Sequence, residues 1–326
     1  MACYHPLLAY NISREEGKFE LVFDRNKAME HGFPRPISLP CQKCVGCRLD
    51  YSRQWANRCM LELQYHKSSY FITLTYDDEH LPRTYSADPE TGEIISPVAT
   101  LVKRDFQLFM KRLRKNTQQK LRFMAAGEYG TNTFRPHYHV ILFGLELDDL
   151  VPYKNSRLGY QYYNSETVQK AWSDSSGQPL GFVVVGAVTW DTCAYVARYV
   201  MKKAMGPTPL FSCEGANIQP EFSLMSRRPG IGRQYYDDHP ELWRFDKINI
   251  STSSGGRSFY PPRYYERLFD IDNPDEAFQR RLRKIHFAIK LPSQKLRLTD
   301  KTYFDILQTE EEFRINRLKS LRRDII

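Results

Sequence analysis

Apolar and polar positions alternate over residues 121–144, and this stretch carries the clearest structural pattern in the chain. Leu121–Ala126 predicts a first strand, and His137–Phe143, rich in aromatic and β-branched residues, predicts a second. The polar connection Tyr129–Pro136 ends in a proline that suits the start of a strand, because no hydrogen bond of the ladder is lost there. We therefore expect a β-hairpin.

Side chains alternate across a strand, so His137 and His139 share one face while Tyr138 and Val140 take the other. Two imidazoles on one face at the mouth of a hairpin can hold a metal ion. Glu128, at the end of the preceding strand, can close that site with a carboxylate. The alternative is a pair of half-exposed strand histidines that bind nothing.

The same periodicities predict the other elements. Residues 70–76 (YFITLTY) indicate a central strand, because both faces are apolar or hydroxyl-bearing. Residues 103–115 indicate an amphipathic helix that covers one face of the sheet, with Phe106, Phe109, Met110 and Leu113 inward. Further helices are expected at 48–66, 166–172, 192–204 and from 275 onward, a strand at 182–188, and loops or irregular structure at 1–40, 77–97, 146–180 and 207–262. This order predicts an α+β fold, an antiparallel sheet with helices on one side.

Composition indicates a globular chain that binds nucleic acid. Of the 326 residues, 41% are hydrophobic and 13% aromatic, and no apolar run approaches the roughly 20 residues of a membrane span. The start MACYHPLL lacks the order of a signal peptide, so we expect an intracellular soluble protein. Lys and Arg exceed Asp and Glu by 47 to 38, and with 21 Tyr and 19 Phe this suits phosphate contacts and base stacking.

Seven cysteines, an odd number in a chain without an export signal, make a disulfide framework an unsuitable interpretation. Three of them form Cys41-x2-Cys44-x2-Cys47, a spacing that lets thiolates converge on one tetrahedral zinc ion. The fourth ligand could be Cys3, His5 or Cys59, of which we prefer Cys3. The alternative is a reduced cysteine cluster with no special role.

Two basic segments are candidate DNA contacts. Arg48, Arg53 and Arg58 occupy predicted exposed positions of the helix at 48–66, and they form either a phosphate-contacting surface or a solvated helix face. Arg227 and Arg228 lie in SRRPGIGR, the most basic turn of the region that follows residue 206.

In the helix predicted at 192–204, Tyr195, Tyr199 and Lys203 are four residues apart and lie on one ridge. A phenol has a pKa near 10 and is a poor nucleophile at neutral pH. Beside a cation, and aimed at a phosphate whose oxygens a metal holds, it can attack phosphorus. The alternative is that both tyrosines are core or edge aromatics.

Together these constellations resemble the HUH endonucleases that start rolling-circle replication. The resemblance rests on FITLT (71–75), RPHYHVILFG (135–144) and YVARYVMKK (195–203). The paired tyrosines are similar to those of the replication initiators of small single-stranded DNA phages. MACYHP, PCQKCVGCR, GEYG and SRRPGIG further resemble the replication initiation proteins of gokushoviruses, a subfamily of the Microviridae.

The resemblance implies a role for each matching residue. His137 and His139 would bind the metal, with Glu128 as a third ligand by position. Tyr195 would be the cutting nucleophile and Tyr199 the second one, although the order of the two stays open. The supporting residues are fewer: Lys203, or less well Lys202, would stabilise the phosphate, and Asp77 and Asp78 are not required by the family pattern.

The implied activity is metal-dependent nicking of single-stranded origin DNA through a 5′-phosphotyrosyl intermediate, followed by strand transfer and circle closure. Two imidazoles and a carboxylate suit Mn²⁺ or Mg²⁺, and Zn²⁺ would sit separately at the cysteines. The implied partners are origin DNA and the host polymerase and helicase in the host cytoplasm, with no membrane. ATP is not needed, and no P-loop signature is present. The implied fold is an RRM-like or ferredoxin-like antiparallel sheet.

These interpretations divide the chain into three parts. Residues 1–66 hold the cysteines and a basic helix, residues 67–206 form the endonuclease core, and residues 207–326 are an irregular basic region with C-terminal helices. Two other functions stay open: a transposase or relaxase with the same chemistry, and a non-catalytic zinc-bearing nucleic-acid-binding protein. A covalent DNA adduct that survives SDS separates the nucleases from the binding protein.

Overall fold

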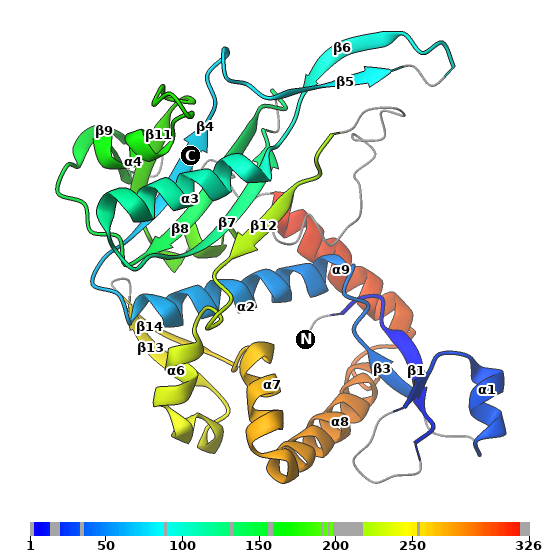
Figure 1. Ribbon diagram of the computed structural model, residues 1–326. Helices are drawn as coiled ribbons and strands as arrows, with labels where there is room; N and C mark the ends of the chain where they lie inside the picture. Colours follow the sequence, from blue (N-terminus) through cyan, green and yellow to red (C-terminus); the bar gives the residue numbers. More distant parts are fainter. Residues whose placement is uncertain are drawn as a thin grey trace. The chain divides into compact units, whose positions relative to one another are not determined.

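The structure is a computed structural model (Figure 1). It describes residues 3–13, 20–32, 36–87, 90–130, 133–155, 159–190, 192–194, 196–197, 218–252 and 255–319. The chain forms two compact units: the first combines residues up to Tyr51 with those from Asp246 onward, and the second is formed by Ser52–Phe245. Each unit is described by itself, and the three-part division expected from the sequence stays a prediction.

The second unit is built on a seven-stranded antiparallel sheet with β4 at its centre. Its strands, in spatial order, are β12 (Phe222–Met225), β7 (Arg122–Tyr129), β8 (Pro136–Phe143), β4 (Ser69–Thr75), β11 (Val183–Ala187), β10 (Gln161–Asn164) and β9 (Val151–Asn155). The predicted α+β class, the hairpin of β7 and β8, and the central position of β4 are confirmed.

One face of this sheet is covered by α3 (Lys103–Thr117) and α4 (Glu166–Ala171). The inward positions predicted for α3 are buried and pack with Tyr138, Val140 and Leu142 of β8. Tyr138 also fixes the start of this helix, because its hydroxyl donates to the Val102 carbonyl (2.9 Å) and accepts from the Val102 amide (3.1 Å). Helix α3 therefore lies across the sheet, as Figure 1 shows.

The opposite face is covered as well, which corrects the expectation of helices on one side only. Residues of α2 (Val45–Leu63), among them Trp55 and Cys59, pack with Ile141 and Phe143 of β8. The run VILF at the end of β8 is apolar at every position, so both faces of the strand need a cover. A two-layer arrangement would leave one of them in water.

Three regions expected to be loops or irregular contain strands. Strands β9 and β10 extend the sheet, β12 closes its other edge, and β5 (Arg83–Ala87) pairs with β6 (Ile94–Ala99) in a separate hairpin. After β12 the second unit ends with α6 (Arg233–Asp238) and the 3-10 helix η3 (Pro240–Arg244).

The first unit holds the two ends of the chain. Strands β1 (Leu7–Asn11), β2 (Leu21–Val22) and β3 (Pro36–Leu39) form a small sheet in the order β2-β1-β3, and α1 is Arg25–Glu30. The later elements are the hairpin of β13 (Ile248–Thr252) and β14 (Gly255–Phe259), followed by α7 (Arg263–Asp272), α8 (Pro274–Leu296) and α9 (Tyr303–Lys319). The helical pattern predicted from residue 275 onward is confirmed. Within the described residues, no helix is both long and apolar enough to cross a lipid bilayer.

Gly181 is the tightest glycine of the sheet. It lies where the segment before β11 runs beside the end of β4, and its φ is +149°. A Cβ built there would be 2.3 Å from the Thr75 carbonyl oxygen, whereas one at Gly177 would meet nothing within 4 Å.

We expect Gly181→Ala to lower the free energy of unfolding by about 3 kcal/mol or more, because the methyl group collides with backbone that cannot yield. Gly177→Ala, also at positive φ, should cost only about 1 kcal/mol. Chemical denaturation measures both. Equal losses for the two variants would contradict the close packing at Gly181.

Candidate metal centres

The register of β7 and β8 brings three metal-ligating side chains together. Glu128 is the direct partner of His137, and Ala126 that of His139. Because alternate residues of a strand share a face, all three ligating side chains project from the face that α2 covers. Ligand atoms of Glu128, His137 and His139 lie within 4.8 Å of one another. The grouping predicted from the sequence is present.

The three groups converge on one oxygen atom. Nε2 of His137 and Nε2 of His139 each lie 2.8 Å from Oε1 of Glu128. Glu128 and His139 are almost fully buried, and the side chain of His137 keeps 18% of its surface exposed. Solvent or a ligand therefore reaches the group from the His137 side.

The outer nitrogen atoms of both imidazoles have their own contacts. Nδ1 of His137 lies 3.0 Å from the Arg135 carbonyl, and Nδ1 of His139 lies 3.1 Å from Oγ1 of Thr73. A carbonyl only accepts hydrogen bonds, so Nδ1 of His137 carries the proton and Nε2 presents a lone pair to Glu128 unless the ring is cationic. A lone pair facing a carboxylate calls for a cation between them. This arrangement fits a divalent metal ion, with the outer contacts fixing the ring orientation.

Glu128 supplies a permanent negative charge. Burial by itself would raise its pKa, but hydrogen bonds from His137 and His139, together with their charge, outweigh burial and lower the pKa to about 2. The carboxylate is ionised at neutral pH, as a metal ligand must be.

Asp77 and Asp78 do not join this group within the described structure. Asp77 pairs with Nδ1 of His80 at 2.9 Å, and Asp78 accepts from Nη1 of Arg135 at 2.7 Å. Arg135 also donates to the Tyr76 carbonyl and so ties the hairpin to the end of β4. These aspartates hold the surrounding backbone.

Tyr195, Tyr199 and Lys203 lie outside the described residues. Their described neighbours Cys193 and Val196 are fully buried and belong to the apolar cluster on the face that carries the histidines. The helical pattern predicted here holds for residues 192–194 and 196–197.

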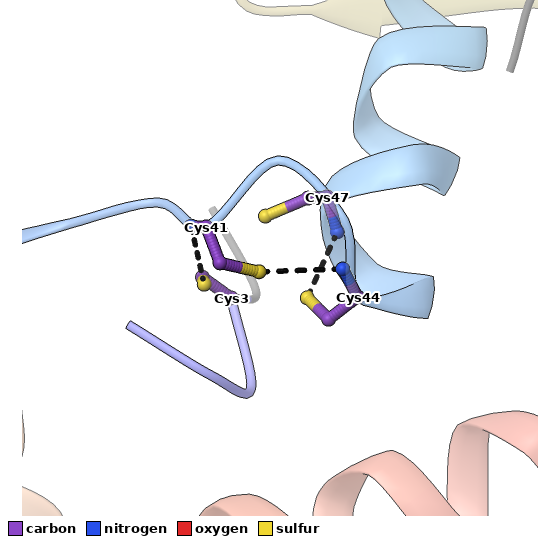
Figure 2. A group of neighbouring side chains, drawn as sticks. All are labelled: Cys3, Cys41, Cys44 and Cys47. Carbon is purple, nitrogen blue, oxygen red and sulfur yellow. Dashed lines mark hydrogen bonds between the residues drawn. The ribbon is translucent and has the colours of Figure 1, made fainter. Parts of the chain in front are cut away.

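A second centre is formed by cysteines of the first unit. Cys3, Cys41, Cys44 and Cys47 have sulfur atoms within 4.8 Å of one another, and Figure 2 shows them turned toward a common space. Cys3 comes from the N-terminal segment, and Cys47 lies in the first turn of α2. Of the proposed fourth ligands, Cys3 is the one that the structure brings to the group.

Backbone amides point at these sulfur atoms. The amide of Cys41 donates to Sγ of Cys3 (3.2 Å), that of Cys44 to Sγ of Cys41 (3.3 Å), and those of Tyr4 and Cys47 to Sγ of Cys44 (3.4 and 3.5 Å). Burial would raise the pKa of Cys44, but the amides and neighbouring thiols lower it to about 7. Burial instead raises the pKa of Cys3 and, with the neighbouring thiols, that of Cys47. Four protonated thiols are too crowded to be favourable here, and a thiophilic cation resolves the crowding.

The other two ligand candidates are engaged elsewhere. His5 pairs through Nε2 with Oε2 of Glu311 (2.5 Å), and Cys59 is fully buried in the second unit against Sδ of Met124 (3.3 Å). The cysteine cluster instead packs beside Tyr4 and against Leu307 of α9, within the first unit.

The predicted DNA-contacting arginines differ in exposure. Arg53 is exposed, whereas Arg48 and Arg58 are half-buried, so the predicted exposure is wrong for these two. The guanidinium of Arg58 donates twice to the Ile231 carbonyl, at 3.0 and 2.9 Å. The basic turn leaves two side chains exposed, those of Arg227 and Arg228.

Sequence reasoning missed what holds this basic turn. Glu62 of α2 is buried; it accepts from the Gly232 amide (2.6 Å) and from Nε of Arg122. Arg122 also donates to the Pro229 carbonyl (3.0 Å). The signal was an acidic residue among apolar helix positions, which indicates a buried charge with partners. The turn is therefore fixed on the sheet by charge-assisted hydrogen bonds.

Comparison with known proteins identifies the class first. Residues 69–204, which include the metal-ligating hairpin, match a family of replication-associated proteins of the ORF2 type. The whole chain is 32% identical to the replication-associated protein ORF2 of Spiroplasma virus 4, covering 98% of that protein. It is 30% identical to the replication-associated protein VP4 of Bdellovibrio phage phiMH2K over 80% of this chain and 75% of the relative.

A third relative is the replication-associated protein ORF4 of Chlamydia phage 1, which is 28% identical over 74% of this chain and 56% of that protein. The chain belongs to this family of Microviridae replication-associated proteins, and the predicted resemblance to gokushovirus initiators is confirmed. No solved structure gives a significant match.

We expect the Glu128 centre to bind Mn²⁺, and the binding to be lost in Glu128→Gln and His137→Ala, because each removes one ligand of three. Isothermal titration of metal-free protein measures the affinity, with a drop of about tenfold or more expected for each variant. His80→Ala, which removes an imidazole outside the group, is the control. Unchanged Mn²⁺ affinity in both ligand variants would contradict the site.

We expect the purified protein to hold a single zinc ion per chain at Cys3, Cys41, Cys44 and Cys47. Cys3→Ser should weaken retention of zinc against a chelator, because an alcohol replaces a thiolate. Cys59→Ala, which removes a thiol far from the group in sequence, should retain the ion. Elemental analysis after dialysis measures the metal content, and zinc loss from both variants or from neither would count against the assignment.

Proposed function

We propose that this protein initiates rolling-circle replication of a single-stranded DNA phage by nicking origin DNA with a tyrosine nucleophile. One observation carries the proposal: the Nε2 atoms of His137 and His139 converge on Oε1 of Glu128 in a family of replication-associated proteins. Further support comes from Cys193 and Val196, which flank Tyr195 and are buried on the same face of the sheet.

Glu128, His137 and His139 would hold Mn²⁺ or Mg²⁺, since imidazole and carboxylate ligands suit these ions. When bound, the ion supplies Lewis-acid polarisation of the scissile phosphate. The four cysteines would hold Zn²⁺, whose role is to fold the N-terminal segment onto its surroundings.

The chain's own residues perform the covalent chemistry. The phenol oxygen of Tyr195 attacks phosphorus, the bond from phosphorus to the 3′-oxygen breaks, and the phenol proton is released as the 3′-hydroxyl forms. The product is a 5′-phosphotyrosyl enzyme. Tyr199 makes the second cut at the regenerated origin, and the free 3′-hydroxyl then attacks the first phosphotyrosine to close a circle. Lys203 balances the negative charge on the phosphate.

Because the phosphotyrosyl bond keeps the energy of the phosphodiester, the reaction needs no ATP. The free 3′-hydroxyl is a primer for the host polymerase, with a host helicase separating the strands, so the protein would act in the host cytoplasm. Arg53, Arg227 and Arg228 are exposed and would contact phosphates. The two half-buried arginines, Arg48 and Arg58, are weaker candidates for that role.

We expect a covalent protein–DNA band on an SDS gel when the protein is incubated with labelled single-stranded origin DNA and Mn²⁺. The band should survive each single variant, Tyr195→Phe or Tyr199→Phe, if the phenols are interchangeable, and disappear in the double variant. Loss in Tyr195→Phe alone would make Tyr195 the initiating nucleophile.

The control is Tyr153→Phe, which removes an exposed phenol on the far edge strand β9. It should form the adduct normally. Tight DNA binding with no adduct under any condition would overturn the nuclease and leave a nucleic-acid-binding protein. A binding protein would also keep its DNA affinity in His137→Ala with chelator present.

A further inference from the structure

The outward face of α3 carries a row of cations that the nicking mechanism does not use. At 100° per residue, Arg104, Lys111 and Lys115 lie within a narrow strip opposite the buried stripe of Phe106 and Leu113. All three are exposed. We call these three residues the basic ridge. With a rise of 1.5 Å per residue, they are spaced by about 10 and about 6 Å along the helix axis.

Much of the protein's net charge is on this one helix. Its 15 residues include six Lys or Arg and one Asp, an excess of five positive charges against nine for the whole chain. The single acid, Asp105, accepts a hydrogen bond from the hydroxyl of buried Tyr76 (2.7 Å) and so faces inward. The outward face of the helix is left without a negative charge.

Other exposed cations in this protein have carboxylate partners, for example Lys170 with Glu166 and Arg233 with Asp237. Among the residues that the structure describes, Arg104, Lys111 and Lys115 pair with none. Lys111 and Lys115 are also four residues apart, a spacing at which like charges destabilise a helix. A solvated helix face usually mixes signs, so this arrangement favours a surface that meets a polyanion.

The basic ridge and the metal centre belong to opposite faces of one sheet. Helix α3 packs on the face that carries Tyr138, whereas His137 and His139 project from the other face. No side chain of the ridge can reach a phosphate held at Glu128 through the sheet between them. The ridge therefore binds DNA away from the cut, or it does not bind DNA.

We propose that the basic ridge is a second DNA-binding surface, which holds the phosphate backbone of a single strand remote from the nick. The choice of DNA rests on the proposed function, but the ridge is independent of cleavage. Its contacts are to phosphates and carry no sequence information. A single strand long enough to pass round the edge of the sheet would occupy both faces at once.

The test is the triple variant Arg104→Gln, Lys111→Gln and Lys115→Gln in the full chain, with single-strand affinity measured as a function of salt. Losing three phosphate contacts should reduce the slope of log K against log salt by about 2. A long oligonucleotide should bind about tenfold or more weakly at low salt. A short one that covers only the nick site should bind and be cut as in the unmodified protein.

The matched control is Arg283→Gln, Lys290→Gln and Arg297→Gln, which removes the same charge from exposed positions of the first unit. Its salt slope should stay unchanged. The ridge variant should also unfold at the same or higher denaturant concentration, because like-charge repulsion is relieved.

Three results would overturn the proposal: an unchanged slope in the ridge variant, an equal loss in the control variant, or a loss confined to duplex DNA. The last would assign the surface to double-stranded DNA instead. Failure of the nicking reaction with the ridge effect intact would reject the proposed function alone, because the ridge is measured by binding.

Discussion

The antiparallel register of β7, β8 and β4 is the constraint on which the rest depends. It sets Glu128 opposite His137 and Thr73 opposite His139, so three strands supply the ligands and the group that orients one of them. A slip of one residue would turn every ligand to the other face. Burial of both faces of β8 excludes that slip, because the same slip would move Tyr138 out of the contacts that start α3.

This dependence explains which features could be read from the sequence. The hairpin, β4 and α3 follow from local periodicity, and the grouping of Glu128 with the histidines follows from strand alternation across one tight pairing. The pairing partner of β12 and the strands β9 and β10 did not, because their short, tyrosine- and proline-bearing segments gain strand structure only from the sheet edge beside them.

Two further features needed the tertiary structure. An apolar run such as VILF indicates burial on both sides but does not say which helices supply the cover, and α2 became visible as the second layer only through Trp55 and Cys59. Likewise, the spacing of the cysteines predicts three ligands, whereas the choice among Cys3, His5 and Cys59 depends on contacts distant in sequence. Glu311 and Met124 decide it, by engaging the other two candidates.

The two centres differ in ligand chemistry in a way that sorts metals without any difference in access. Four sulfur ligands favour zinc, while two imidazoles and a carboxylate leave positions for substrate oxygens on a harder ion. Zinc could also occupy the imidazole site, and there its strong affinity would compete with Mn²⁺ or Mg²⁺. A cysteine cluster in the same chain that binds zinc more tightly lowers that competition, provided the chain is loaded in an excess of the harder ion. The folding role of the thiolates and the chemistry at Glu128 are then linked through metal selection rather than through contact.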